Sequence, residues 1–232
     1  MVNAAKAWSA TSERTLDVQK IDELRLPEEL VDEPFYLIHF AAGYRYYDQG
    51  NYKEALPHFE AALRRKGGSP NEIADLQFFS GLCAYISGAG QKDMSAKLQE
   101  AIELYEKAAE AYEQADQKKW ANTQNNLANA YALLPIGDRA ANLQKAVAAY
   151  EAALRVSTEK DFPVDWAQTQ NNLGIAYAQL PTGDRATNMQ KAKAYFESAL
   201  TVFTENGFPN EHRRAAASLA DVEQQLGSLS SN

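Results

Sequence analysis

The sequence WANTQNNLANAYALLPIGDRAANLQKAVAAYEAALRVSTEKDFPVD occupies residues 120–165, and residues 166–211 repeat it with 29 of the 46 positions identical. Long internal repeats are typical of solenoid proteins, in which each repeat buries its apolar face by stacking on its neighbours. Each copy contains two helical patterns separated by a turn that carries Pro and Gly. The sequence therefore predicts an all-α solenoid of helical hairpins.

The composition agrees with one elongated domain. The chain has 232 residues, of which 45% are hydrophobic, so it has enough apolar material for a core. Its net charge of -8 disfavours nucleic acid and anionic membrane surfaces as partners. No segment approaches the roughly 18 apolar residues of a membrane span, and the N-terminus has no secretory signal pattern. We expect a soluble, cytoplasmic protein without membrane insertion.

Signals for catalysis or cofactor binding are weak. His39, His58 and His212 occur singly, without ligands at metal-site spacing, so we expect them on the surface or in packing contacts. Cys83 lies between apolar residues and is expected to be an inert core thiol. We therefore expect no enzymatic activity, no metal and no cofactor. Arg139 and Arg185 recur after Gly-Asp; of an anion site and a salt bridge between successive repeats, we favour the salt bridge.

The two ends of the chain differ from the repeats. Residues 1–34 read as an acidic leader, in which four apolar side chains are able to dock a short helix on the first repeat: Leu16, Ile21, Leu24 and Leu26. Residues 228–232 read as a tail.

From Phe35 onward, small and bulky residues recur at helical spacing. The first hairpin carries Gly43, Tyr46, Ala55, Phe59 and Ala62, and the later hairpins carry equivalents such as Gly81, Tyr105, Leu127, Tyr150, Gly174 and Phe196. This pattern resembles the tetratricopeptide repeat (TPR), in which a small residue permits the close crossing of helices A and B and aromatic rings fill the space beside it. The resemblance implies a right-handed superhelical solenoid of about four repeats plus a C-terminal capping helix.

The expected repeats cover residues 35–68, 71–116, 118–162 and 164–208, and the capping helix covers 210–227. The last two repeats are longer than the usual 34 residues. One insertion, L-P-x-G-D-R-A, stops helix A and places Asp138 or Asp184 to cap helix B. Another ends in Phe-Pro after helix B. Similar long repeats, with the same N-N-L and G-D-R-A phrases, occur in TPR proteins of cyanobacteria and other bacteria.

In TPR arrays the A helices line the concave face, and the resemblance places a row of amides there. The positions are Asn122, Asn125, Asn126 and Asn129 in the third repeat and Gln168, Asn171, Asn172 and Ile175 in the fourth. Because a carboxamide offers both a donor and an acceptor, such a row suits the main chain of an extended peptide. The alternative is that some of these amides, Asn126 and Asn172 above all, bond neighbouring helices.

The equivalent face of the first two repeats is aromatic and contains Phe40, Tyr44, Tyr47 and Phe78, with Tyr85 as a further candidate. Aromatic rings there suit an apolar anchor of a partner, unless the leader or a neighbouring helix covers them. The first repeat lacks the Lys and Asn pair of carboxylate-clamp TPRs, which disfavours a chaperone C-terminal tail as the ligand.

Two functions follow from the resemblance. In the first, the chain is an interaction module or adaptor that binds a protein or peptide partner in the concave groove and assists assembly or localisation of a complex. Because the chain is acidic, we expect that partner to be basic or neutral. In the second, the chain is a self-associating structural array, a homo-oligomer or a monomer whose groove holds its own leader.

Overall fold

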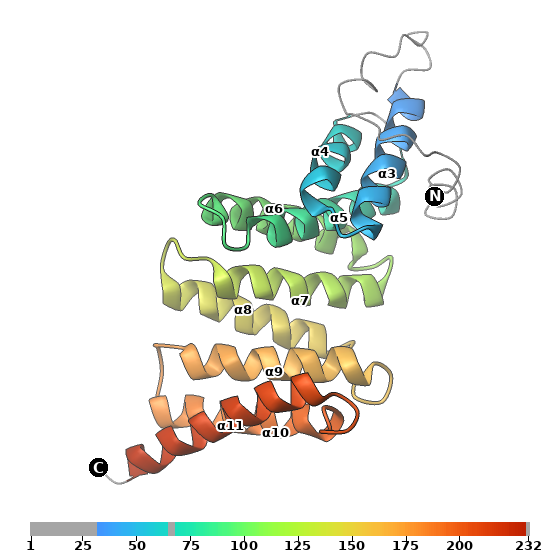
Figure 1. The fold of residues 1–232 in the computed structure, drawn as a ribbon. Coiled ribbons are helices and arrows are strands. Elements are labelled where there is room, and N and C mark those ends of the chain that lie inside the picture. Colours follow the sequence, from blue (N-terminus) through green and yellow to red (C-terminus); the bar gives the residue numbers. More distant parts are fainter. Residues whose placement is uncertain (1–31, 65–67, 231–232) are drawn as a thin grey trace. The chain divides into compact units, whose positions relative to one another are not determined.

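The computed structural model describes residues 32–64 and 68–230, and every regular element in these ranges is an α-helix (Figure 1). The nine helices that are described are α3 (Asp32–Asp48), α4 (Tyr52–Leu63), α5 (Pro70–Gly88), α6 (Met94–Tyr112), α7 (Gln117–Leu133), α8 (Arg139–Leu154), α9 (Pro163–Gln179), α10 (Arg185–Val202) and α11 (Pro209–Ser230). The all-α prediction is confirmed. The predicted docking residues of the leader lie outside the described residues, and α3 begins at Asp32.

The chain divides into two compact units, Met1–Asp116 and Gln117–Asn232. Their boundary coincides with the expected boundary between the second and third repeats. In unit 1, α3 packs on α4, α4 on α5, and α5 on α6. In unit 2, the helices from α7 to α11 each pack on the next one along the chain. We call α3, α5, α7, α9 and α11 the A helices and the remaining four the B helices.

Each unit depends on close crossings between an A helix and its B helix. A Cβ atom added at Gly43 would lie 2.8 Å from the ring of Phe59, and one at Gly174 would lie 2.9 Å from the ring of Phe196. Both rings are almost completely buried. A glycine is therefore required at these crossings because the aromatic ring occupies the space of a side chain. The crossing residues expected from the sequence are confirmed at both positions.

The L-P-x-G-D-R-A insertion forms the turn between α7 and α8. Gly137 has a φ of 78°, which an L side chain rarely adopts, and Asp138 caps α8 by accepting a hydrogen bond from the amide of Ala140 at 2.8 Å. The buried Asn142 donates to the carbonyl of Ile136 at 2.8 Å and holds the turn against the helix. A similar arrangement recurs 46 residues later. Gly183 has a φ of 82°, Asp184 accepts a hydrogen bond from the amide of Thr187 at 2.8 Å, and Asn188 donates to the carbonyl of Thr182 at 2.8 Å.

The salt bridge expected for Arg139 and Arg185 is wrong. Arg139 donates to the carbonyl oxygen of Ala132 at the end of α7 and, at 2.8 Å, to the side-chain carbonyl of Gln179 on α9. Arg185 repeats this arrangement with Ala178 and, at 2.9 Å, with Gln225 on α11. These arginines do connect successive repeats, as expected, but their acceptors are neutral amides.

The link between α5 and α6 comprises residues 89–93. One element boundary differs from that expected. Helix α11 continues to Ser230, beyond its expected end at Gly227. Among the helices that the structure describes, none combines the length and apolar character of a membrane span.

The core of unit 1 contains the side chains of His39, His58 and Cys83. The His39 and His58 side chains are both buried, and their Nδ1 atoms lie 3.4 Å apart, so the expectation of a packing role is met for this pair. Cys83 is fully buried, and burial raises the pKa of its thiol to about 12.

Replacing Gly174 by Leu should lower the free energy of unfolding by about 1–3 kcal/mol, because the new side chain overpacks the crossing against Phe196. Chemical denaturation followed by circular dichroism measures the change. Gly227→Leu is the matched control, since a Cβ atom there meets nothing within 4 Å. Equal stability of the two variants would contradict the assigned crossing.

Cys83 should react with a thiol-specific reagent much more slowly than a free thiol at pH 8, because its pKa of about 12 and its burial keep it protonated and inaccessible. A colorimetric assay of native and denatured protein measures the two rates. Rapid labelling of the native protein would contradict the position of Cys83 in the core.

Candidate functional site

Helix α11 continues the register of the A helices in unit 2. Its residues follow those of α9 at the same 46-residue offset, so Pro209 corresponds to Pro163 and Leu219 to Leu173. Gln225 accepts the hydrogen bond of Arg185 just as Gln179 accepts that of Arg139. Helices α7, α9 and α11 are therefore three equivalent A helices, and their groove-facing positions can be compared one by one.

Between α7 and α9, the amide row forms hydrogen bonds that connect the two helices. The Thr169 hydroxyl shares its single proton between the carbonyl of Asp165 at 2.8 Å and Oδ1 of Asn125 at 3.2 Å. Nδ2 of Asn172 donates to Oδ1 of Asn129 at 3.1 Å. The hydroxyl of Tyr150 on α8 donates to the same oxygen of Asn129 at 2.6 Å. The carbonyl oxygens of Asn125 and Asn129 therefore stabilise the packing of repeats.

On α9 the amides also bond one another. Nε2 of Gln168 donates to Oδ1 of Asn172 at 3.1 Å, and Nδ2 of Asn171 approaches the same oxygen at 3.5 Å. Asn172 thus uses both its donor and its acceptor within the protein. The side-chain carbonyls of Gln168 and Asn171 accept no hydrogen bond from any residue that the structure describes.

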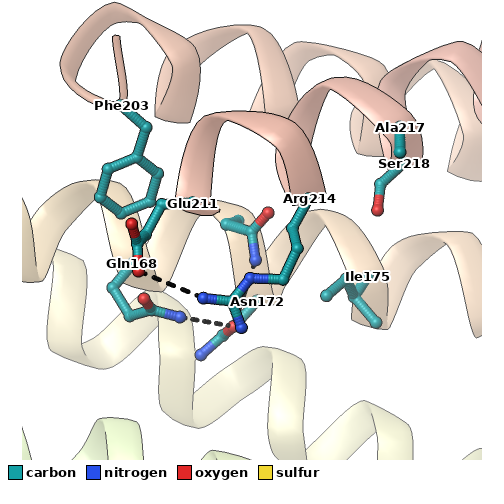
Figure 2. Close-up of a pocket in the computed structure, with 9 residues that line it drawn as sticks. Gln168, Asn172, Ile175, Phe203, Glu211, Arg214, Ala217 and Ser218 are labelled. Atoms are coloured by element: carbon teal, nitrogen blue, oxygen red, sulfur yellow. Dashed lines mark hydrogen bonds and ion pairs between the residues drawn. The ribbon is translucent and has the colours of Figure 1, made fainter. Parts of the chain in front are cut away.

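A pocket of about 380 Å³ lies between α9 and α11 (Figure 2). Phe203, which is 2% exposed, contributes to its wall, and Ile175 remains 37% exposed. The pocket is lined by Gln168, Asn171, Asn172, Ile175, Phe203, Glu211, Arg214, Ala217 and Ser218. Polar amides and apolar surface therefore meet within one concave site of unit 2.

The two charged residues of the pocket form an ion pair. Nη2 of Arg214 lies 3.2 Å from a carboxylate oxygen of Glu211, and Figure 2 shows the Arg214 side chain pointing from α11 toward the amides of Gln168 and Asn172. The Arg214 side chain is 73% exposed, so this pair contributes little to stability. Residues 117–232 contain 11 Lys and Arg and 11 Asp and Glu, which makes unit 2 neutral.

The structure separates the predicted amide residues into two groups. Gln168, Asn171 and Ile175 line the pocket, whereas Asn125 and Asn129 belong to the contact between α7 and α9. Asn122 is half-buried on α7 and lies outside the pocket lining.

The α11 side of the pocket was not predicted from the sequence, because residues 210–227 were expected only to form a capping helix. This side comprises Glu211, Arg214, Ala217 and Ser218. The 46-residue offset was the signal that could have found this side, since it relates Arg214 to Gln168 and Ser218 to Asn172.

The aromatic candidates belong to unit 1, where Tyr44, Tyr47 and Phe78 surround Phe79. Phe79 was not predicted from the sequence. Phe79 lies 5.6 Å from Tyr44 and 5.0 Å from Tyr47, measured between ring centroids, and 5.6 Å from its neighbour Phe78. Tyr44, Tyr47 and Phe78 are half-buried, whereas Phe40 is only 2% exposed and serves the core. The adjacent Phe78 and Phe79 were the signal in the sequence for this cluster, but helical spacing alone favoured Phe78 as the residue on the groove face.

A second pocket, of about 400 Å³, lies in unit 1 beside α4 and the link between α5 and α6. Its lining includes Lys53, Glu60, Asp93 and Lys97. Burial, and secondarily the nearby Glu100, raises the pKa of Glu60, while Lys97 pairs with Glu100 at 2.7 Å. Among the described residues, no group of three or more His, Cys, Asp or Glu is placed to hold a metal ion.

Comparison with known proteins agrees with this architecture. A family model described as tetratricopeptide repeat matches residues 36–68, which correspond to α3 and α4. No curated protein matches the chain.

Many solved structures are similar to the chain, and two of them each match most of its length. The first, the segment 41-end of MamA from Desulfovibrio magneticus RS-1, has a TM-score of 0.54 and 15% sequence identity, and the match covers 85% of this chain and 97% of that one. The second, BtubC (BKLC) from P. vanneervenii, has a TM-score of 0.49 and 17% identity over 99% of this chain and 93% of that one. The repeat match at residues 36–68 and the likeness to MamA identify the fold as that of a TPR-type helical-repeat protein.

Proposed function

We propose that the chain is a protein-interaction module whose A-helix face in unit 2 binds an extended segment of a partner protein. The TPR-type fold supports a role in protein interaction or scaffolding in general. The observation that carries the specific proposal is the pocket between α9 and α11, into which amides recurring along the A helices present hydrogen-bonding groups.

The chemistry of the pocket fits a polypeptide main chain. An extended segment presents N–H and C=O groups in alternation, and the side-chain carbonyls of Gln168 and Asn171 are acceptors for its N–H groups. Exposed Ile175 and Ala217 supply apolar contact beside these acceptors. A volume of about 380 Å³ suits one or two side chains of such a segment.

The alternative, a self-associating array whose groove holds its own leader or another copy, makes a different prediction about size. Light scattering over a range of concentrations, with the full chain and with residues 1–31 deleted, separates the two. A concentration-independent monomer that binds a partner supports the interaction module, whereas concentration-dependent assembly supports self-association.

The proposal assigns the chain no catalysis of its own. Cys83 is buried with a raised pKa, and His39 and His58 are enclosed in the core of unit 1, so these three side chains are not accessible to a substrate. Turnover of any substrate that is lost on replacing one of these three residues would overturn this part of the proposal.

Asn171→Ala should weaken partner binding about 2- to 10-fold, because a neutral hydrogen bond contributes about 0.5–1.5 kcal/mol. Asn125→Ala, at the equivalent position on α7, is the matched control. Its carbonyl bonds Thr169, so we expect lower stability and little change in affinity. The measurement is a calorimetric titration against a partner identified by affinity capture, with circular dichroism as the control for folding.

The pair of variants distinguishes binding from stability. If Asn171→Ala binds normally and Asn125→Ala weakens binding, then the partner contacts α7 and the site is misplaced. If both variants bind like the wild type, the amide face does not contact the partner and the proposed function fails.

A further inference from the structure

The side of α11 that is equivalent to the B-helix side of α9 is exposed. On α9 this side packs against α10, and a Cβ atom added at Gly174 would lie 2.9 Å from the Phe196 ring. At the 46-residue offset, Ala167, Gln170, Gly174 and Tyr177 of α9 correspond to Arg213, Ala216, Ala220 and Glu223 of α11. The four residues of α9 are buried, whereas Arg213, Ala220 and Glu223 are exposed and Ala216 is half-buried. We call these four residues of α11 its open face.

The open face has small residues in the middle and opposite charges at its two ends. Its residues are spaced by three, four and three positions, so they lie along one side of the helix. Arg213 forms no hydrogen bond or ion pair with any residue that the structure describes. At the other end, carboxylate oxygens of Glu223 and Glu197 lie 2.7 and 3.7 Å from the one ammonium group of Lys193. These three groups together therefore carry one uncompensated negative charge.

This pattern is complementary to itself. Arg213 and Glu223 each lie five residues from position 218, and Ala216 and Ala220 each lie two residues from it. When a second α11 runs antiparallel with its position 218 at the same level, Arg213 of each copy lies opposite Glu223 of the other. The alanines then meet in the middle, where small side chains let the helix axes approach to about 8 Å. A two-fold contact of this kind uses the same surface on both copies.

We propose that the chain forms a homodimer through the open face of α11, with the two helices antiparallel. Arg213 of each copy supplies the positive charge that the group of Lys193, Glu197 and Glu223 lacks, and the two-fold symmetry forms this contact twice. A partner segment with charges of a single sign would be attracted at one end of the face and repelled at the other. The charge pattern therefore favours a second copy of the chain.

The dimer contact lies on a different side of α11 from the pocket. The pocket is lined by Arg214, Ala217 and Ser218, none of which belongs to the open face. Dimerisation therefore leaves the pocket accessible, and this inference goes beyond the proposed function without depending on it. One side of a single 22-residue helix buries less than the about 800 Å² per partner of a stable complex, so we expect a dissociation constant of about 10–100 μM.

Exchanging the two charges tests the dimer. Arg213→Glu alone and Glu223→Arg alone each place like charges opposite each other, so each variant should associate about 10-fold or more weakly than the wild type. An equimolar mixture of the two variants should dimerise again, because both contacts of the mixed dimer pair opposite charges. Lys160→Glu is the matched control, since it makes the same change in net charge at an exposed residue outside α11. Sedimentation velocity from about 5 to 500 μM measures association, with circular dichroism as the control for folding.

Disulfide cross-linking tests the register. Position 216 of one copy lies opposite position 220 of the other, so a mixture of Ala216→Cys and Ala220→Cys should cross-link in oxidised glutathione faster than either variant alone. A mixture of Ala216→Cys and Ser228→Cys is the control, because Ser228 is exposed but lies outside the open face. The native Cys83 does not contribute, since it is buried and its thiol has a pKa of about 12.

The outcomes separate this inference from the proposed function. A wild type that stays monomeric up to about 500 μM, or a mixture of the charge variants that associates no more tightly than either alone, overturns the dimer. Equally fast cross-linking in the control mixture overturns the antiparallel register. Arg213→Glu should still bind the captured partner with wild-type affinity, so the groove is tested independently. Because dimerisation through α11 depends on concentration, the light-scattering comparison with the self-associating array is made in Arg213→Glu, in which only assembly through the groove remains.

Discussion

The close crossing between a small residue on each A helix and an aromatic ring on its B helix is the contact on which the repeats depend. The Phe196 ring fills the space that a side chain of Gly174 would occupy, and the Phe59 ring does the same at Gly43. Because the packed ring fixes both the separation and the rotation of the two helices, it determines which residues of the A helix face away from the B helix. The amides of α9 face the pocket as a consequence of this crossing.

The turn after each A helix in unit 2 then fixes the spacing between repeats. Asp138 caps the N-terminus of α8, and the side chain of Asn142 donates a hydrogen bond to the turn. Arg139 donates a hydrogen bond to Gln179 on the next A helix. Arg185 makes the same link from α10 to Gln225. The acceptors are neutral amides and Arg139 and Arg185 are exposed, so the link involves neither an ion pair nor the burial of a charge. This link connects α9 and α11 at one end, while their groove faces remain apart at the pocket.

The sequence predicted the parts of this structure that follow from local geometry. Gly174 and Phe196 were found because a close crossing demands a small residue at a fixed distance from a ring, and Asp138 was found because a helix start demands a cap. The acceptors of Arg139 could not be found in this way, because they lie on another helix and depend on how the repeats stack. Asn125 and Asn171 occupy the same position in successive repeats, yet only the Asn125 carbonyl has a donor, because the donor comes from the neighbouring helix.

The pocket therefore arises because successive repeats share the same backbone fold but differ in sequence where their A helices meet. Between α7 and α9, Thr169 and Asn172 form hydrogen bonds with Asn125 and Asn129 that connect the two long repeats. Helix α11 has Leu219 and Gln225 at the positions of Leu173 and Gln179 on α9. Ala215 and Ser218, however, occupy the positions of Thr169 and Asn172. Ala215 is fully buried, so its small size does not arise from solvent exposure at the end of an array. The connecting groups are absent at a packed position beside an intact Arg185–Gln225 link, so the side-chain carbonyls of Gln168 and Asn171 line the pocket without a donor among the described residues.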